Sequence, residues 1–462
     1  MYYPVLEGTR HALLPGNFKV GIWPRSTVSI VLADPAAIKE VTTHRARFPK
    51  PVSNYRVLTF FGKNIIASEG EEWKRYRKIA APAFSEKNNK LVWDETIRIM
   101  LDLFDNVWHR APEVSYDHCI EITLPFYVTV RRLLFSRGTA GFGRRISWTD
   151  DLKVPEGHLL TFKDALHIVS TDTLLKIVVP NWAMGLTERT RKCRLAFEEL
   201  DRYMMEMIQG RRSAEKKEER YDLFSSLLDA ADGEEESKLS DRELVGNIFI
   251  FLVAGHETTA HTLCFCFAYL ALYPEEQERL YRQIKDVIKD AGRLPTYEEM
   301  GSLTYSMAVF YETLRLRPPV AGVPKVSAED TSLAISNSRG EKMTLPIPCG
   351  TRLILNIAGL QHNPRCWDDP DAFKPERFLG EWPKDAFLPF SGGARACIGR
   401  RFFETEGIAI LTMLVSQYSV EIKDEPQFAQ ESFEERHARV LRSTQGLSTT
   451  PVRVPVTFKR RT

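Results

Sequence analysis

Residues 390–399 read Phe-Ser-Gly-Gly-Ala-Arg-Ala-Cys-Ile-Gly, and a helix is expected directly after them. The stretch places Cys397 in a glycine-rich loop just before a helix N-terminus. Backbone N–H groups and the positive end of the helix dipole lower the pKa of a thiol there and donate hydrogen bonds to its sulfur. Gly393 and Gly399 let the backbone pass close to a large planar group, and Arg395 can pair with a carboxylate of that group. By residue types alone, a buried cysteine in a tight turn is an equally good interpretation.

A charged motif lies upstream, in a helix expected over Thr304–Arg317. Glu312 and Arg315 stand three residues apart and therefore share one helix face, where they can hold a third group in a fork. Such a pair alone is common on protein surfaces. Arg377 strengthens the signal, because it stands 20 residues before Cys397.

The most apolar segment carries a third motif. Ser240 is expected to cap a helix that runs to Tyr273, about 32 residues or ~48 Å long. A helix that is apolar nearly all round must be buried in a large protein. In its middle, residues 254–259 read Ala-Gly-His-Glu-Thr-Thr. The Thr258 hydroxyl can bond a carbonyl one turn back and Gly255 weakens the helix, which favours a local opening for a diatomic ligand and water; a helix segment without function is the alternative.

Two other interpretations of this segment are less favourable. It is long enough to cross a membrane, but His256, Glu257 and His261 at its midpoint are costly in lipid. His256 and Glu257 also begin a zinc-protease-like H-E-x-x-H motif. The fifth position is Ala260, and His261 lies ~140° around the helix axis from His256, so the two imidazoles cannot bind one zinc ion. We therefore expect His261 to pack between helices.

Composition sets the outer bounds. The chain has 462 residues, which implies a large one-piece enzyme fold or two to three domains. Apolar residues at 43% and charged residues at 27% exclude collagen, coiled coil and wholesale disorder. A net charge of +2 is too balanced for a dedicated nucleic-acid binder. Seven cysteines without a C-x-x-C pair indicate neither a disulfide framework nor a zinc ribbon.

The remaining pattern is mainly helical with a small β-region. Asp34 is expected to cap a helix that begins at Pro35, and the last helix is expected to follow Cys397. Strand signals occur at Phe18–Trp23, Thr27–Leu32, Val323–Val326, Met343–Ile347 and Arg352–Leu355, and the tail Gly446–Phe458 alternates like a hairpin. Because these segments come from both chain ends and the middle, we expect one minor antiparallel sheet and a single domain over residues 1–462.

Together these motifs resemble the cytochrome P-450 family. F-x-x-G-x-R-x-C-x-G is the haem-ligand loop of that family, and residues 390–399 match it at every fixed position. The resemblance covers essentially the whole chain, which is similar to fungal, microsomal-type members. It implies a mainly α fold, with a large helical region, a long central helix and a small β-sheet region. It also implies haem b as the cofactor and Cys397 as the axial thiolate ligand of its iron.

The resemblance assigns further roles. Residues 254–258 match the oxygen-activation motif [A/G]-G-x-[D/E]-T, so Thr258 would hydrogen-bond dioxygen and Glu257 would relay protons as the catalytic pair. Trp73 and Arg77 resemble the W-x-x-x-R motif, which holds a haem propionate. The residues expected to bind haem, besides Cys397, are Phe390, Gly393, Arg395, Gly399, Ala254, Trp73 and Arg77. The residues expected to form the buried structural triad are Glu312, Arg315 and Arg377.

Cations near these motifs indicate a redox partner. Lys74, Arg75 and Lys78 are expected to point outward and, with Arg400 and Arg401, to form a basic patch suited to an acidic partner. A plain solvated helix face is the alternative. Lys325 is a further candidate for a propionate contact.

The implied reaction inserts one oxygen atom of O2 into an apolar small molecule, as in fungal secondary metabolism or xenobiotic oxidation. No glycine-rich flavin or nicotinamide fingerprint follows a strand. We therefore expect electrons from NADPH through a separate NADPH–cytochrome P-450 reductase, with cytochrome b5 as a second donor. The alternatives are a haem-binding sensor or sequestration protein, and a peroxide-using or isomerising enzyme on the same fold.

The expected location is the cytosolic face of the endoplasmic reticulum membrane, with the protein as a monomer. Microsomal relatives begin with a membrane helix. Here Met1 stands just before the first strands, so neither that anchor nor a signal peptide is expected in this chain. The stretch Arg131–Arg137 is more basic than the resemblance leads one to expect.

Overall fold

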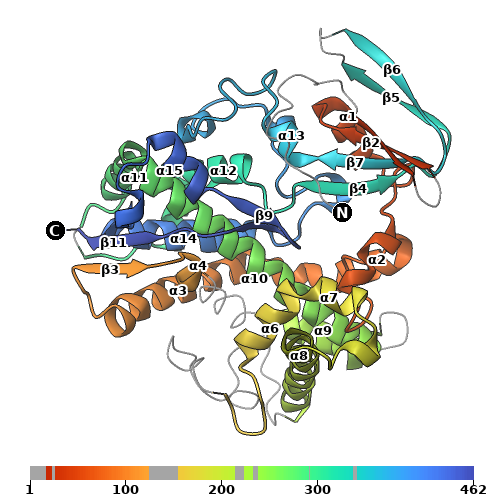
Figure 1. Ribbon diagram of the computed structural model, residues 1–462, viewed down its shortest axis with the longest axis horizontal. Helices are drawn as coiled ribbons and strands as arrows, with labels where there is room; N and C mark the ends of the chain where they lie inside the picture. The colour runs from red at the N-terminus through yellow and green to blue at the C-terminus, as the bar shows by residue number, and fades with distance from the viewer. Residues whose placement is uncertain are drawn as a thin grey trace. The chain divides into compact units, whose positions relative to one another are not determined.

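The computed structural model describes residues 17–22, 26–123, 154–213, 223–232, 238–290, 292–336 and 341–461 (Figure 1). The chain divides into two compact units that alternate along the sequence. Unit 1 comprises Met1–Pro51, Leu314–Lys374 and Gly380–Cys397, and unit 2 comprises Val52–Thr313, Pro375–Leu379 and Ile398–Thr462. The expectation of one domain over the whole chain stays a prediction. The basic stretch Arg131–Arg137 lies outside the described residues.

Unit 1 is built on a four-stranded sheet with the order β1-β2-β7-β4. These strands are β1 (Asn17–Ile22), β2 (Ser26–Leu32), β4 (Gly322–Val326) and β7 (Arg352–Asn356). All four were predicted to within one residue at either end. The expectation of a purely antiparallel sheet is wrong, because β2 and β7 pair in parallel with Ile30 opposite Leu353. Sequence alternation defines the buried face of a strand but not the direction of its partner.

The rest of unit 1 contains helices and a second pair of strands. Helix α1 (Pro35–Thr43) begins as predicted, because the Asp34 carboxylate accepts a hydrogen bond from the Ala37 N–H at 2.9 Å. Helix α13 (Ile357–Gln361) follows β7 directly. The antiparallel pair β5 (Thr331–Ser336) and β6 (Lys342–Ile347) forms a separate ribbon, of which only β6 was predicted.

Unit 2 contains most of the helices. They are α2 (Gly70–Ala80), α3 (Glu86–Asp102), α4 (Ile120–Thr123), α6 (Phe162–Thr171), α7 (Thr173–Val178), α8 (Glu188–Arg212), α9 (Leu223–Asp232), α10 (Asp241–Leu272), α11 (Pro274–Val287), α14 (Arg400–Gln417) and α15 (Phe433–Val440). Helix α12 (Thr304–Leu316) begins in unit 2 and ends in unit 1. Helix α15 was not predicted, so the expectation that the helix after Cys397 is the last one is wrong.

Helix α10 has the predicted length and ends. A reciprocal capping box joins Ser240 and Glu243 at its start, and Pro274, which cannot continue a helix, opens α11 after Tyr273. By length and composition α10 could cross a membrane, and it is the one such helix among the described residues. However, 78% of its most apolar window is buried inside the protein. Helix α10 is therefore a core helix of unit 2.

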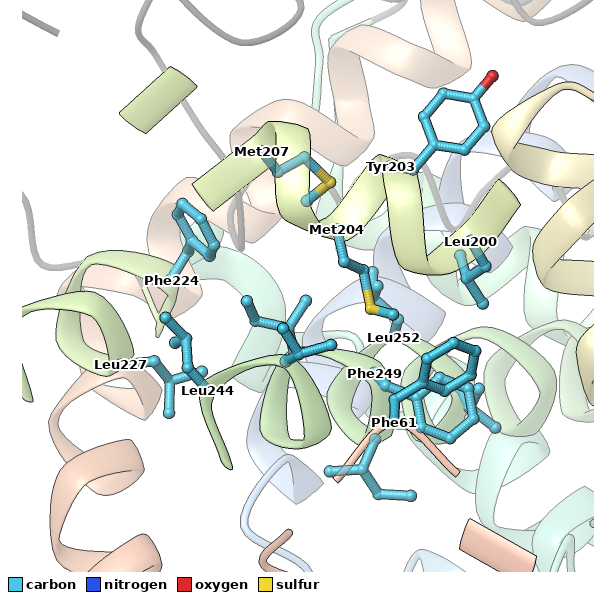
Figure 2. Close-up of a cluster of buried hydrophobic side chains, with 14 of the residues drawn as sticks. Phe61, Leu200, Tyr203, Met204, Met207, Phe224, Leu227, Leu244, Phe249 and Leu252 are labelled. Carbon is cyan, nitrogen blue, oxygen red and sulfur yellow. The ribbon is translucent and has the colours of Figure 1, made fainter. Parts of the chain in front are cut away.

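The core of unit 2 lies where α8 and α9 cover the first half of α10. Figure 2 shows Met204 of α8 directed toward α10, where Phe61 and Phe249 lie, and Met207 one turn further along α8. The rings of Phe61 and Phe249 lie 4.5 Å apart. Flexible methionine side chains between aromatic rings fill irregular gaps without strain.

Two small sheets complete unit 2. One has the order β3-β11-β8, from β3 (Glu113–Tyr116), β11 (Val456–Arg460) and β8 (Tyr418–Ile422). The other pairs β9 (Ser443–Gln445) with β10 (Thr449–Pro451). The predicted hairpin over Gly446–Phe458 is therefore wrong, because β11 pairs with β3 and β8 rather than with β10. Partners so distant in sequence are selected by packing and not by local pattern.

Two glycines hold the segment around residue 62 against α10. A Cβ atom on Gly246 would lie 2.5 Å from the Lys63 carbonyl oxygen, and one on Gly62 would lie 1.9 Å from the Arg242 carbonyl oxygen. The buried Asn247 side chain closes the junction, since its Oδ1 accepts from the Ile65 N–H at 3.0 Å. This close approach requires the absence of a side chain on both backbones.

We expect Gly246→Ala to destabilise the protein by about 1–3 kcal/mol, because the new methyl group meets backbone that cannot move aside. The thermal unfolding midpoint measures the effect. Gly185→Ala is the control, because nothing lies within 4 Å of a Cβ there. Equal midpoints for the two variants would contradict the close-packed junction.

Candidate functional site

The loop before α14 closes on itself in unit 1 and presents a thiol. The Cys397 N–H donates to the Phe390 carbonyl at 2.8 Å, and the Ala396 N–H donates to the Gly393 carbonyl at 3.1 Å. Gly393 has a φ of +63°, and a Cβ there would lie 2.1 Å from the Thr42 carbonyl oxygen of α1. Glycine is thus required twice over, by its conformation and by the approach of α1. The contribution of Thr42 carried no sequence signal.

The donor set of this loop fits one particular kind of metal complex. Cys397 is exposed, whereas Cys119, Cys193, Cys264 and Cys266 are buried. The interpretation of Cys397 as a buried cysteine in a tight turn is therefore excluded. Among the described residues no group of three or more His, Cys, Asp or Glu side chains could hold a metal ion. A lone soft thiolate suits an iron whose other ligands come from a macrocycle, so the residues fit a haem.

Arg315 fixes the meander, the irregular segment that runs from the end of α13 to the loop. Its buried guanidinium donates to the carbonyls of Gln361, Pro370 and Ala372 at 2.9, 2.7 and 3.1 Å. The Gln361 amide donates to the Arg315 carbonyl at 3.0 Å, and its oxygen accepts from the Leu388 N–H at 2.9 Å. Gln361 therefore links the end of α12 to the residues just before the loop. Sequence reasoning missed it, because a lone glutamine is no motif.

The other two members of the expected triad meet in unit 2. The Arg377 Nε donates to the Glu312 carboxylate at 3.3 Å, and Glu312 is completely buried. A buried carboxylate needs such a partner, because removing a charge from water is costly. Within the expected triad, Arg377 thus neutralises the buried Glu312, and Arg315 also binds backbone carbonyls.

The middle of α10 offers a single accessible strip. Between residues 244 and 270 every residue of the helix is buried except Phe251, Ala254, Gly255 and Thr258. Their spacing of three and four residues places them on one face. The Thr258 hydroxyl donates to the Ala254 carbonyl at 2.6 Å, as the sequence predicted, while the helix continues without a break. The strip thus consists of Phe251, two small residues and the Thr258 hydroxyl at its other end.

Glu257 points away from the strip into the core of unit 2. The Ser448 hydroxyl donates to its Oε2 at 3.5 Å, and the same hydroxyl lies 2.8 Å from Nδ1 of His261. Burial raises the pKa of Glu257 to about 7, although the Ser448 hydrogen bond works in the opposite direction. Burial also lowers the pKa of His261 to about 4. The expectation that His261 only packs between helices is thus incomplete.

Helix α2 carries the other expected haem contacts. Trp73 is buried and Arg77 is half-buried. Arg75 corrects a prediction, because its guanidinium contacts the Glu243 carboxylate and donates to the Lys238 carbonyl at 2.7 Å. The capping box of α10 places Glu243 there, so Arg75 does not point outward.

Lys74, Lys78 and Arg400 are more exposed than Arg75, whereas Lys325 is buried. Lys74 is paired with Glu71 at 2.6 Å and half exposed, and Lys78 is exposed. Arg400 is held by Glu404 at 2.8 Å and by the Tyr311 hydroxyl. Lys325, offered as a second propionate contact, is buried in β4.

Arg401 lines an open groove of about 590 Å³ between α3 and the turn Tyr297–Ser302. The residues that line the groove are Glu86, Lys87, Lys90, Tyr297, Glu298, Gly301 and Arg401. Sequence analysis missed Lys87 and Lys90, because charged residues on an amphipathic helix carry no positional signal.

Comparisons with known proteins match this arrangement. The family model for cytochrome P-450 matches residues 17–447. Cytochrome P-450 monooxygenase 124 of the fungus Postia placenta is 56% identical over 446 residues, which cover 96% of this chain and 85% of the relative. Cytochrome P-450 monooxygenase ORF6 of Penicillium roqueforti is 29% identical over 84% of this chain and 73% of the relative. A crystal structure of a cytochrome P-450 haem domain shares the fold, with a TM-score of 0.75 and 23% identity over 95% of this chain and 89% of that chain.

The chain therefore belongs to the cytochrome P-450 family. It is an oxygen-incorporating oxidoreductase of the monooxygenase class with haem as its cofactor. The predicted mainly α fold with a small β-region is confirmed.

The raised pKa of Glu257 predicts a pH-dependent cost in stability. A buried carboxyl whose pKa is about 7 in the folded state and near 4.5 in the unfolded state is stabilising only while protonated, so the folded state loses stability between about pH 4.5 and 7. Glu257→Gln should therefore match wild type near pH 4.5 and become more stable by about 3 kcal/mol above pH 7. Urea unfolding across this range measures the difference.

Glu406 is also buried, and burial raises its pKa to about 8. Glu406 is present in both the wild type and Glu257→Gln, so its contribution to the pH dependence of stability cancels in the comparison. A stability difference that does not change with pH would show that Glu257 titrates normally.

Proposed function

We propose that this protein is a haem-thiolate monooxygenase that inserts one oxygen atom of O2 into an apolar small molecule. The observation that carries the proposal is the closed glycine-rich loop with its exposed thiol, Cys397, directly before α14. In the sequence, Cys397 stands two residues before Gly399, the cap of α14, and a position just before a helix N-terminus favours a thiolate over a thiol.

Haem b is the proposed form of the cofactor. Cys397 would be its axial ligand, Arg395 would pair with a propionate, and Phe390 and Gly393 would shape the loop. Trp73 and Arg77 of α2 would hold a propionate, and Gly399 and Ala254 would leave room for the ring. When bound through a thiolate, haem supplies the activation of O2 and the cleavage of its O–O bond.

Thr258 and Glu257 would supply the proton chemistry. The Thr258 hydroxyl is the polar end of the accessible strip on α10, and its bond to the Ala254 carbonyl fixes its direction. Glu257 is adjacent in sequence and faces the core. A carboxyl with a pKa of about 7 can both donate and accept a proton at neutral pH.

An apolar substrate agrees with the surroundings of this strip. Phe251 is the first residue of the strip, and partly buried apolar side chains, here called the apolar margin, pack against the hydrophobic core of unit 2. Members of that margin are Leu58, Ile66, Phe84, Phe251, Ile398 and Leu447. Such side chains gain free energy by covering an apolar molecule and offer no hydrogen bonds to a polar one.

Electrons would come from NADPH through a separate NADPH–cytochrome P-450 reductase, with cytochrome b5 as a second donor. The exposed cations Lys74, Lys78 and Arg401 support an acidic partner, and Lys87 and Lys90 extend the basic surface around Arg401. Arg75 is omitted from this surface because it is bound to Glu243.

Attachment to the cytosolic face of the endoplasmic reticulum membrane is supported by exposed apolar side chains just before α6 and between α6 and α8. They are Leu159, before α6, and Ile177, Val178, Trp182 and Leu186, between the two helices, and they are 68, 52, 75, 80 and 71% exposed. Soluble surfaces seldom gather so many large apolar groups, and tryptophan is favoured where lipid meets water.

The first test concerns the thiolate. Cys397→Ala should lose the thiolate-type Soret band of the ferrous–CO form, because the described residues place no other cysteine in such a loop. Cys349→Ala removes the other exposed cysteine and should keep the band. A band retained in Cys397→Ala would exclude the proposed ligand. Product formation from NADPH with a reductase then separates an enzyme from a haem-binding sensor.

The second test concerns electron delivery. Lys74→Glu and Arg401→Glu should each slow the first electron transfer from the reductase several-fold at low ionic strength and weaken its salt dependence. Stopped-flow reduction measures both effects. Arg194→Glu makes the same charge change on α8, where Arg194 is half exposed, and should leave the rate unchanged. Slowing by all three variants equally would show a general charge effect and no docking surface.

A further inference from the structure

We propose that His261 and Ser448 form a hydrogen-bonded relay that delivers protons to Glu257, with Ser448 as its positioning residue. This inference rests on the proposed function, in which Glu257 supplies protons for oxygen activation. It adds a path for protons within the interior of unit 2. Two residues that belong to no sequence motif, His261 and Ser448, form this path.

Helix geometry and one tight turn assemble the relay. His261 follows Glu257 by four residues, so both side chains leave the same face of α10 one turn apart. Ser448 belongs to the turn between β9 and β10. That turn is held by the Gly446 N–H and the Thr450 hydroxyl, which both donate to the Ser448 carbonyl, at 3.0 and 3.2 Å. The turn thereby places one hydroxyl between the imidazole and the carboxyl.

The single proton of the serine hydroxyl gives the relay its direction. When Ser448 donates to Glu257, its oxygen must accept from Nδ1–H of His261, at 2.8 Å. When Glu257 is protonated, the order reverses: the carboxyl donates to Ser448, and Ser448 donates to Nδ1. The two arrangements differ by the transfer of one proton along the chain and by the tautomer of a neutral histidine.

The proton count balances at each atom. A proton binds Nε2 of His261 while Nδ1–H passes its proton to the Ser448 oxygen, and the original hydroxyl proton passes to Oε2 of Glu257. The histidine is neutral before and after, and the carboxylate has become a carboxyl. Glu257 then releases that proton, and His261 returns to the first arrangement by losing the proton on Nε2 and binding one at Nδ1.

The electrostatic surroundings keep the histidine neutral, which this exchange requires. Ser448, His261 and Glu257 are 3, 5 and 7% exposed. Besides burial, the charges that lower the pKa of His261 are those of His118, before α4, and His167, on α6. For Glu257 the Ser448 hydrogen bond is the one interaction that opposes the effect of burial. A neutral donor with a hydroxyl bridge transfers a proton without creating a buried ion pair.

The test measures the protonation of Glu257 and the use of electrons in the same holoenzyme. Infrared titration should show a carboxyl band that disappears with a midpoint near pH 7, and it is assigned to Glu257 by its absence in Glu257→Gln. Ser448→Ala should raise the midpoint by about one pH unit, because the hydrogen bond to the carboxylate is lost. It should also raise the fraction of NADPH electrons that leave as hydrogen peroxide, because protons then reach Glu257 more slowly.

Two variants serve as controls. Ser448→Thr retains the hydroxyl and should restore both readouts, whereas Ser443→Ala removes an exposed hydroxyl from β9 and should change neither. A midpoint and peroxide fraction unchanged in Ser448→Ala would overturn the relay while the proposed function stands. Absence of the thiolate Soret band or of product in the wild type would instead contradict the proposed function.

Discussion

The burial of α10 is the constraint on which unit 2 depends. A 32-residue helix that is apolar nearly all round has no face that water can cover, so other elements must surround it. Helices α8 and α9 cover its first half, and α4, α11, α14, β8 and β10 also pack against it. What this packing leaves accessible is one strip of mostly small residues, with Thr258 at its end. The candidate site on α10 is thus the part of the helix surface that the surrounding elements leave uncovered.

The loop before α14 depends on a different kind of interaction, the satisfaction of backbone carbonyls by side-chain donors. Arg315 donates to three carbonyls of the meander, and Gln361 passes the connection to Leu388. A guanidinium has several donors in a rigid plane, so one side chain can fix a stretch that has no regular structure. Gly393 then admits the carbonyl of Thr42. The position of the Cys397 thiol follows from these backbone contacts in unit 1.

The buried carboxyl of Glu257 is maintained at a cost to stability. Glu257 is buried with a hydroxyl as its partner rather than a cation, and burial raises its pKa to about 7. Glu312, by contrast, has Arg377 at 3.3 Å and serves structure. A cation beside Glu257 would stabilise the carboxylate and make it a poor proton donor at neutral pH. The different partners of these two buried glutamates agree with the proposed roles, Glu257 as a proton carrier and Glu312 as a structural support.

The sequence by itself determined the elements whose signals are local. Local residues predict the caps of α1 and α10, the start of α14 and four strands of unit 1. The glycine-rich motif at residues 390–399 likewise marked Cys397 as a candidate ligand. Tertiary structure alone decided the features that join distant segments. These are the parallel pairing of β2 with β7, the place of β11 in a sheet with β3 and β8, the turn of Arg75 toward Glu243, and the meeting of Ser448 with His261. The physical reason is that capping and periodicity act over a few residues, whereas strand partners and buried polar contacts are selected by the packing of the whole unit.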